Sequence, residues 1–175
     1  MEGPLEGIRI LDFTRITAGP YGSLLLADLG AEVIKIEAPT SKMRQVRGML
    51  DTNAGEKYDF SIKGIATHYL AMNRNKKSIA LNMRHEKGRE IFRDLVKVSD
   101  VVLDNFRAGT TKKMGIDFEA LSQVNPRIVT FSINAYGESG PLSGRGGFDP
   151  IGQALGGGMS VTTGSDGAPV RPGIS

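Results

Sequence analysis

Two successive strand-helix-strand patterns constrain the fold of this chain most strongly. The first places a predicted strand at residues 8–13 (IRILDF), a leucine-rich helix at residues 21–29 that ends at Gly30, and a second strand at residues 31–37 (AEVIKIE). Glycine is the usual residue past the end of a helix, and β-branched residues favour strands. Because such a unit is normally parallel and right-handed, this pattern predicts the start of a parallel sheet.

The second pattern repeats the first. Strands are predicted at residues 77–83 and 100–106, on either side of a helix at residues 86–98, and a further buried strand is predicted at residues 127–135. One apolar face of the helix is predicted to hold Ile91, Phe92, Leu95 and Val96. Apolar strands that alternate with helices indicate an α/β fold with a doubly wound, mostly parallel sheet. Ligands of such sheets bind beyond the carboxyl ends of the strands.

The remaining segments are predicted to be mostly loops. Residues 38–63 mix proline, glycine, serine and charged residues without a helix or strand period, and residues 107–116 form a connection before a short helix at residues 118–124. After Tyr136 the glycine content rises, and only residues 151–155 are predicted to be helical.

The composition excludes several kinds of site. Hydrophobic residues make up 39% of the chain and charged residues 23%, which is typical of an ordered globular protein. With no cysteine and two histidines, disulfides, thiolate nucleophiles and thiolate or all-histidine metal sites are excluded, and we expect no metal. No apolar run approaches the roughly 20 residues of a membrane span, and the first residues do not resemble a secretory signal. We therefore expect a cytoplasmic protein without a membrane partner.

Lysine and arginine are concentrated in one part of the chain. Residues 73–93 hold seven of them against two glutamates, although the net charge of the whole chain is only +3. A solvated basic face, a nucleic-acid patch and a phosphate site all produce this count, so the charge alone does not choose among them.

Common cofactor and catalytic motifs do not account for this sequence. Gly19 and Gly22 do not make the glycine pattern of a dinucleotide site, and Pro20 removes a backbone donor where a pyrophosphate would lie. A P-loop and a Gly-x-Ser-x-Gly elbow are both missing from the sequence. Carboxylates near strand ends or glycine-rich loops are mostly predicted to be caps or surface charges: Asp12, Asp28, Glu37, Asp104, Asp149 and Asp166. Asp149 is interpreted as a helix N-cap.

Several spaced motifs follow one another in an order known from a single family. They are LEGIRILDFTRITAGP at residues 5–20, LGAEVIKIE at 29–37, NRNKKSIALNM at 73–83, DVVLDNFRAG at 100–109, NPR at 125–127 and GFD at 147–149 with QA at 153–154. On these motifs the chain resembles the class III CoA-transferases, which include formyl-CoA and carnitine CoA-transferases and a branch of acyl-CoA racemases.

The resemblance implies a Rossmann-like large domain that binds CoA, of which residues 1–175 would be an incomplete, N-terminal part. The family's small domain and C-terminal return segment, which complete an interlocked homodimer, would then be absent from this chain. The implied partners are an acyl-CoA and a carboxylic acid acceptor, and no nucleic acid is expected. Because CoA carries a pyrophosphate and a ribose phosphate, the basic cluster at residues 73–93 gains a functional explanation.

The resemblance also implies which residues contact CoA. Matching motif by motif gives Thr17, Ala18, Ala38, Leu81, Asn82, Met83, Arg84, Asn105, Phe106, Arg107, Lys113, Arg145, Gly146, Gly147, Phe148 and Asp149. Ala38 stands where the family often has an arginine that stacks on adenine, and Arg44 or Arg47 is considered as a substitute. Lys113 stands where the family has an arginine, so it keeps the charge but loses the planar fork.

The family's nucleophile is an aspartate that follows a proline-glycine segment, and here Pro172 and Gly173 are followed only by Ile174 and Ser175. That carboxylate would attack an acyl-CoA thioester to give a mixed anhydride, CoA thiolate would return to form an enzyme thioester, and the acceptor acid would take the CoA. No catalytic residue is therefore predicted within the chain, and the chain alone is predicted to be inactive.

Two alternatives remain open at this point. One is a racemase, which Phe148 disfavours because that branch has a histidine there to move a proton. The other is a non-catalytic CoA-binding module that works with a separate subunit.

Overall fold

The structure is a computed structural model that describes residues 3–39, 61–62 and 65–173. In chain order its elements are β1 (Arg9–Asp12), α1 (Ala18–Asp28), β2 (Glu32–Glu37), β3 (Ser61–Ile62), β4 (Ile65–Ala66), α2 (Thr67–Asn73), β5 (Lys77–Ala80), α3 (Glu86–Lys97), β6 (Val101–Asp104), α4 (Thr110–Met114), α5 (Phe118–Ser122), β7 (Val129–Ser132), α6 (Asp149–Leu155) and the 3₁₀ helix η2 (Gly158–Ser160). Every predicted CoA contact lies in the described residues, whereas Arg44, Arg47, Ile174 and Ser175 lie outside them.

Five of the strands form one sheet. Its order is β5-β2-β1-β6-β7, and every neighbouring pair is parallel. Numbered along the chain, these strands follow the order 3-2-1-4-5, which is that of a doubly wound sheet. The order reverses between β1 and β6. The predicted fold class is therefore confirmed, and β3 and β4 form a separate antiparallel pair.

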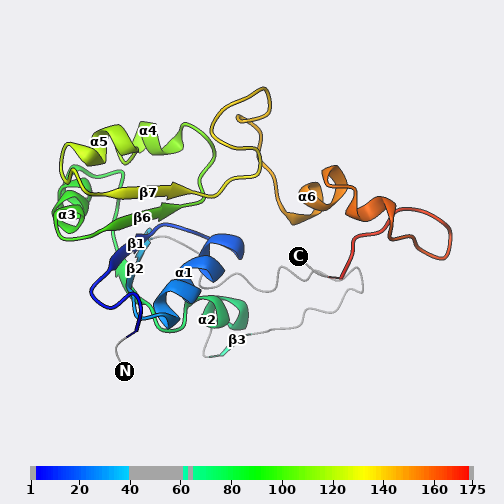
Figure 1. The fold of residues 1–175 in the computed structure, drawn as a ribbon, viewed down its shortest axis with the longest axis horizontal. Helices are drawn as coiled ribbons and strands as arrows, with labels where there is room; N and C mark the ends of the chain where they lie inside the picture. The colour runs from blue at the N-terminus through cyan, green and yellow to red at the C-terminus, as the bar shows by residue number, and fades with distance from the viewer. Residues whose placement is uncertain (1–2, 40–60, 63–64, 174–175) are drawn as a thin grey trace. The chain divides into compact units, whose positions relative to one another are not determined.

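Helices cover both faces of this sheet (Figure 1). On one face, Ala27 of α1 packs with Ile10 and Val33. Helix α2 lies beside α1. On the other face, Phe92 of α3 and Leu121 of α5 belong to the larger core cluster. Since a fully buried side chain of this size contributes about 1.5–3 kcal/mol, the two clusters hold the strands, and so the strand ends, in fixed positions.

Two short helices differ from the sequence prediction. Residues 107–116 were predicted to be a connection, but α4 occupies the middle of this stretch, and α2 was not predicted at all. Neither helix carries a strong sequence signal. The N-cap of α2 is Ala66, whose side chain cannot cap the helix, and α4 has only five residues. Such helices depend on packing against the rest of the fold rather than on their own propensity.

Strand β7 contradicts the prediction of a buried strand. It forms the edge of the sheet, and Val129 and Phe131 are 56% and 55% exposed. Parallel strands are normally buried on both faces, but α1 reaches only the strands nearer the centre. On α3, Phe92 and Val96 are buried as predicted, whereas Ile91 is 46% exposed, because it lies at the margin of the buried stripe.

The chain divides into two compact units. Residues 1–106 and 111–133 form the sheet and its helices, and residues 107–110 and 134–175 form the second unit, which contains α6 and η2. Helix α6 begins at Asp149 and its N-cap is Phe148. The interpretation of Asp149 as the N-cap is therefore wrong by one residue, because Pro150 stands in the first turn and the helix starts just before it.

Candidate functional site

Predicted CoA contacts follow four neighbouring strands at the carboxyl edge of the sheet. Thr17 and Ala18 follow β1, Ala38 follows β2, residues 81–84 follow β5, and Asn105 with Phe106 follows β6. Because the strands are parallel and adjacent in the sheet, these segments share one edge. The Leu81 amide donates a 2.8 Å hydrogen bond to the Glu37 carbonyl, which joins the ends of β5 and β2.

The loop between β1 and α1 has an unusual backbone. Ile16 has a φ of 71°, in the left-handed region, where a β-branched residue is a genuine outlier. Thr17 is the N-cap of α1 but its side chain makes no capping hydrogen bond. Side chains from other elements hold this loop in place, and strain of this kind persists only where the surroundings enforce it.

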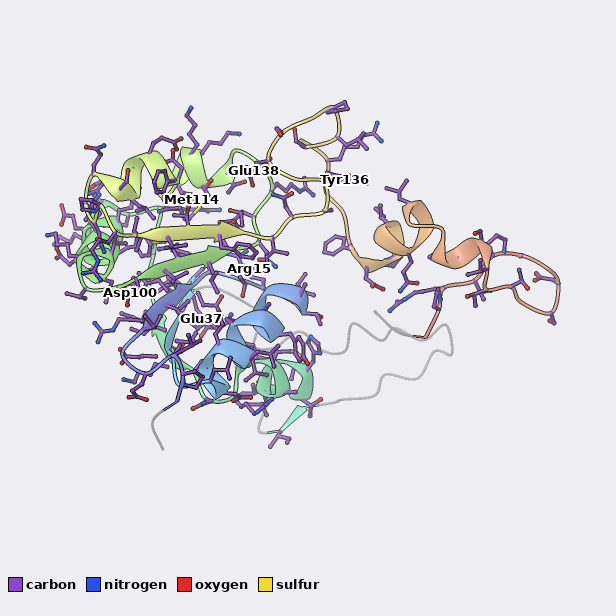
Figure 2. The ribbon with its side chains drawn as sticks, in the orientation of Figure 1. Arg15, Glu37, Asp100, Met114, Tyr136 and Glu138 are labelled. Atoms are coloured by element: carbon purple, nitrogen blue, oxygen red, sulfur yellow. The ribbon has the colours of Figure 1, made fainter. Side chains whose placement is uncertain are left out.

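Asn105 holds the loop from β6. Its Oδ1 accepts a 2.9 Å hydrogen bond from the Arg15 amide, and its Nδ2 donates a 2.7 Å hydrogen bond to the Arg15 carbonyl. The Arg15 guanidinium, which extends from the same loop (Figure 2), lies 5.5 Å from the centre of the Phe106 ring. Phe106 in turn packs on Phe13. Two predicted contacts, Asn105 and Phe106, thus support the loop that carries a third, Thr17.

His68 of α2 contacts the same loop from the other side. Its Nε2 lies 3.2 Å from the Ile16 carbonyl oxygen and 3.2 Å from the Thr17 hydroxyl. His68 is one of the two histidines that are too few for an all-histidine metal site, and a lone histidine in an unpredicted helix gives no sequence signal of this role.

A buried charged cluster lies beneath the loop. Asp12, at the end of β1, is fully buried and accepts hydrogen bonds from the Thr14 amide at 2.7 Å and the Ser23 hydroxyl at 2.7 Å. Lys76 Nζ lies 3.2 Å from its carboxylate and Lys35 Nζ lies 3.8 Å from it. Lys35 also donates a 2.7 Å hydrogen bond to the Thr14 carbonyl. The cluster therefore joins two sheet strands, the loop and α1.

Burial lowers the pKa of both lysines. For Lys35 and Lys76, desolvation is the largest cause, and it outweighs the attraction of Asp12, which acts in the opposite direction. Lys76 is held further by the Pro20 carbonyl at 2.9 Å and the Ser23 hydroxyl at 2.8 Å, both in α1. Sequence reasoning missed this cluster. The one signal was Asp12 at a strand end, because Lys35 had no predicted role and Lys76 was counted within the basic cluster at residues 73–93.

Two more strand-end carboxylates have structural partners. Glu37, after which β2 ends, accepts a hydrogen bond from the Ser78 hydroxyl at 2.5 Å. Asp104, at the end of β6, accepts from the Ser132 hydroxyl at 2.6 Å and from the Phe106 amide at 2.9 Å. These carboxylates tie neighbouring strands together at the edge where the predicted contacts lie.

Residues 81–84 form a tight turn after β5. The Asn82 side chain accepts a hydrogen bond from the Arg84 amide at 3.1 Å, a local turn that explains why β5 ends at Ala80 rather than at Met83 as predicted. Leu81 is buried in the core, whereas Asn82 and Arg84 are exposed.

The predicted basic cluster at residues 73–93 is mostly neutralised. Five of its seven cations pair with carboxylates: Arg74, Lys76, Lys77, Arg89 and Arg93. Among the residues that the structure describes, Arg84 and Lys87 have no such partner. Lys113, predicted to hold a phosphate, is exposed on α4.

The remaining predicted contacts belong to the second unit. The Arg107 guanidinium packs against Gly146 so closely that a Cβ at residue 146 would lie 2.8 Å from it, so these two predicted residues adjoin. A Cβ on Gly147 would collide with Ala135. The Asp149 carboxylate accepts a 2.8 Å hydrogen bond from Gln153 and lies 3.4 Å from Arg171. Phe148 and Arg145 are exposed.

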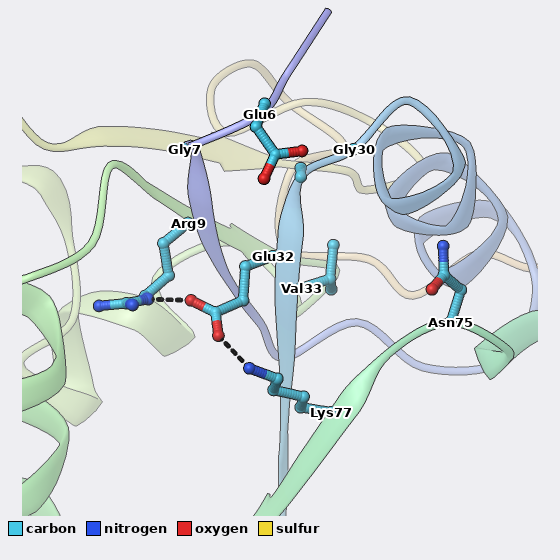
Figure 3. A pocket seen from close by; sticks show the side chains of 9 residues that line it. Glu6, Gly7, Arg9, Gly30, Glu32, Val33, Asn75 and Lys77 are labelled. Atoms are coloured by element: carbon cyan, nitrogen blue, oxygen red, sulfur yellow. Dashed lines mark hydrogen bonds and ion pairs between the residues drawn. The ribbon is translucent and has the colours of Figure 1, made fainter. Parts of the chain in front are cut away.

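A hollow of about 420 Å³ lies at the opposite, amino edge of the sheet. There Glu32 pairs with Arg9 on one side and Lys77 on the other (Figure 3). These two cations lower the pKa of Glu32, Lys77 more than Arg9. No residue on this edge was predicted to bind a ligand.

Neither a metal centre nor a membrane span is found in the described part of the chain. Within residues 3–39, 61–62 and 65–173, no three or more His, Cys, Asp or Glu side chains gather as metal ligands would. The helices of the same ranges are all too short or too polar to cross a bilayer.

Comparison with known proteins matches the chain to a single protein family. The profile of CoA-transferase family III matches residues 5–175. A succinyl-CoA:glutarate CoA-transferase of Mus musculus is 42% identical over 172 residues, which cover 98% of this chain and 37% of that protein. A formyl-CoA:oxalate CoA-transferase of Streptomyces avermitilis is 38% identical over 175 residues, which cover 99% of this chain and 40% of that protein.

Solved structures agree with these matches. The crystal structure of a CAIB/BAIF family protein from Brucella suis superimposes with a TM-score of 0.85 at 36% identity, and the match covers 99% of this chain and 44% of that one. The chain therefore spans about two fifths of the length of these relatives.

Proposed function

The chain belongs to CoA-transferase family III, and from this membership we propose that it forms the N-terminal part of the large, CoA-binding domain of an enzyme that moves CoA from an acyl-CoA to a carboxylic acid. The observation that carries the proposal is the meeting of predicted contacts at one edge of the sheet. The segments at Thr17, Leu81 and Asn105 follow strands that share their carboxyl edge, and β1 and β6 flank the point where the strand order reverses. That point is where doubly wound sheets bind their ligands.

The charges of this edge suit a phosphorylated ligand. Arg84 is an exposed cation at the end of β5 that has no carboxylate partner among the described residues. The N-terminus of α1, an 11-residue helix, opens at Thr17 without a side-chain cap, and the positive end of a helix dipole favours an anion. We therefore assign the phosphates of CoA to this edge. Lys113 and the second unit's Arg107 and residues 145–149 remain proposed contacts.

The proposed chemistry needs a carboxylate that the described residues do not supply. In the route implied by the family, an aspartate attacks the thioester carbonyl and expels CoA thiolate, which leaves a mixed anhydride. The thiolate then attacks the enzyme's own carbonyl, the acyl group departs as a carboxylate, and an enzyme thioester forms. The acceptor carboxylate attacks this thioester and expels CoA thiolate again. Attack of that thiolate on the acceptor's carbonyl gives the new acyl-CoA and restores the aspartate.

The carboxylates at the sheet edge are committed elsewhere. Asp12 is surrounded by Lys35, Lys76 and Ser23, and Asp104 by Ser132. In the second unit, Asp166 accepts the Ala168 amide within a turn. We therefore propose that the nucleophile follows Ser175, that residues 1–175 alone are inactive, and that the complete enzyme is a cytoplasmic homodimer.

Two measurements test this function. Calorimetry with CoA should show binding that the double replacement of Arg84→Ala and Lys113→Ala weakens at least tenfold, because each charge-assisted hydrogen bond contributes about 1.5–3 kcal/mol. A chain extended past Ser175 should exchange labelled CoA between an acyl-CoA and a carboxylic acid. Binding that is indifferent to both cations would contradict the assigned edge, and exchange by residues 1–175 alone would contradict the placement of the nucleophile.

A further inference from the structure

We infer that His68 is a positioning residue that holds the loop between β1 and α1 in the conformation that binds CoA. The inference rests on the proposed function, because Thr17 in this loop is a proposed CoA contact. It adds a residue outside the motifs that carry the family resemblance, from a helix that the sequence did not predict.

The loop needs to be held because its backbone is strained. A φ of 71° at Ile16 brings its Cβ close to the backbone, and a β-branched residue adopts such a conformation only where its surroundings enforce it. Without external contacts, residues 15–17 would relax toward ordinary backbone angles. Thr17 would then leave its position at the start of α1.

Hydrogen bonds hold the strained residue from both sides. Asn105 bonds the amide and the carbonyl of Arg15, the residue before it. His68 reaches the carbonyl of Ile16 itself and the hydroxyl of Thr17, the residue after it, both at 3.2 Å. The contact crosses more than fifty residues of sequence, so it belongs to the tertiary fold and not to the loop. His68 is exposed, and its polar contacts are made to this loop.

The chemistry of the contact sets the direction of the Thr17 hydroxyl. A carbonyl oxygen can only accept, so a hydrogen bond to Ile16 requires the His68 tautomer that carries its proton on Nε2. In that tautomer the same N–H faces the Thr17 oxygen, which then acts as an acceptor toward His68. The Thr17 O–H is thereby left to donate to a ligand oxygen, such as a phosphate or an amide carbonyl of CoA. His68 therefore sets both the place and the polarity of the proposed contact.

We expect His68→Ala to weaken the affinity for CoA without a comparable loss of folding stability. If His68→Ala lets the loop relax, only a fraction of the protein is ready to bind, and the affinity falls by that fraction. The loss of one hydrogen bond of this kind corresponds to about three- to tenfold. His68→Gln keeps an N–H donor and should recover affinity to within about twofold. Leu70→Ala, a matched truncation on the same helix, should leave the affinity unchanged.

The dissociation constant of CoA is measured by calorimetry on the intact protein, and the melting temperature is measured for each variant. Amide hydrogen exchange at residues 14–18 without CoA gives a second readout, which should be faster in His68→Ala alone. Equal affinities of His68→Ala and wild type, or failure of His68→Gln to recover, overturns the inference. If wild type binds no CoA, the proposed function fails, and the exchange rates still decide whether His68 holds the loop, because unchanged rates overturn that as well.

Discussion

Beside the carboxyl ends of β1 and β2, the side chains of Asp12, Lys35 and Lys76 are buried and bond the adjoining loop and α1, whereas at the amino edge Arg9, Glu32 and Lys77 are partly or largely exposed and pair with one another. Lys76 and Lys77 make the contrast within two neighbouring residues. The Lys76 side chain is 1% exposed and bonds Asp12 and α1, while the Lys77 side chain is 71% exposed and pairs with Glu32. Both edges belong to the same five strands.

The difference shows which of the two edges is held in one specific arrangement by its charged side chains. A buried ion pair is expensive to desolvate and is kept only where several hydrogen bonds fix it, so it specifies one arrangement. An exposed pair contributes little and tolerates change. The amino edge has a hollow, and its left-handed residues Gly7 and Gly30 are glycines, which adopt such angles without strain. The carboxyl edge has the strained Ile16, two clamping side chains and the buried Asp12 cluster, which is the pattern expected of a binding edge.

The largest effect is expected from replacing Lys76, the buried cation beside Asp12, because this tests directly whether buried and exposed charges differ in their contribution to stability. Lys76→Met should lower the free energy of unfolding by about 3 kcal/mol or more, because the Asp12 carboxylate loses its closest charged partner in a dry environment. Urea unfolding followed by circular dichroism measures the change. A loss below about 1 kcal/mol would mean that the two edges differ in exposure but not in energetic role.

Asn105→Ala tests whether the loop between β1 and α1 is already held in place in the absence of CoA. Loss of both hydrogen bonds to Arg15 should lower the free energy of unfolding by about 1–3 kcal/mol in the absence of CoA, since each contributes about 0.5–1.5 kcal/mol. If Asn105 served only as a ligand contact, the stability without CoA would be unchanged. The comparison of unfolding curves with and without CoA separates these outcomes.

The two edges should also respond to opposite ends of the pH scale. Because burial lowers the pKa of Lys76 below 10.5, the folded state binds fewer protons than the unfolded chain between these two values, so stability rises with pH in that window. The slope for one lysine is at most about 1.4 kcal/mol per pH unit. At the amino edge, the lowered pKa of Glu32 gives stability that is lost as pH falls below 4.5 through the folded value.

Proton uptake on unfolding at about pH 9.5 measures the first of these effects. Wild type should take up more protons than Lys76→Met, by up to one per molecule. Equal uptake in the two proteins would show that burial does not lower the pKa of Lys76.

The smallest effect is expected at the amino edge. Lys77→Met should change the free energy of unfolding by less than about 1 kcal/mol, and moderate salt should reduce even this difference, because the pair with Glu32 is exposed and screened. The same substitution at Lys76 is its matched comparison. A Lys77→Met effect as large as that of Lys76→Met would remove the distinction between the edges.

Much of the fold could be predicted because its signals are local. Strands β1, β2, β5 and β6 and helix α3 follow from apolar periodicity, and the alternation of strands and helices predicts the parallel sheet. Helices α2 and α4 were missed because they are short and lack caps. The exposure of Phe131 was missed because an apolar strand at the edge of a sheet has the same sequence as one at its centre.

The family motifs predicted which residues lie at the candidate edge, but not the side-chain contacts that hold this edge together. The sequence places Thr17 after its first predicted strand and Leu81 and Asn105 in the last residues of two others, and the parallel sheet brings their segments to one edge. Nothing in the sequence distinguishes Lys76 from Lys77, because burial depends on which way each side chain points from a strand entrance. The role of His68 depends on a contact across the fold and on the backbone angle of Ile16, neither of which a local pattern reveals.

The exposed edge strand β7 has a practical consequence for the solubility of the purified polypeptide. Within the described residues β7 pairs only with β6, and Val129 and Phe131 stand in a row on its open face. Unsatisfied peptide groups beside apolar side chains are a template for another extended segment to join, and a charged side chain on an edge strand opposes such pairing. Phe131→Lys should therefore keep the purified polypeptide monodisperse at a higher concentration than wild type.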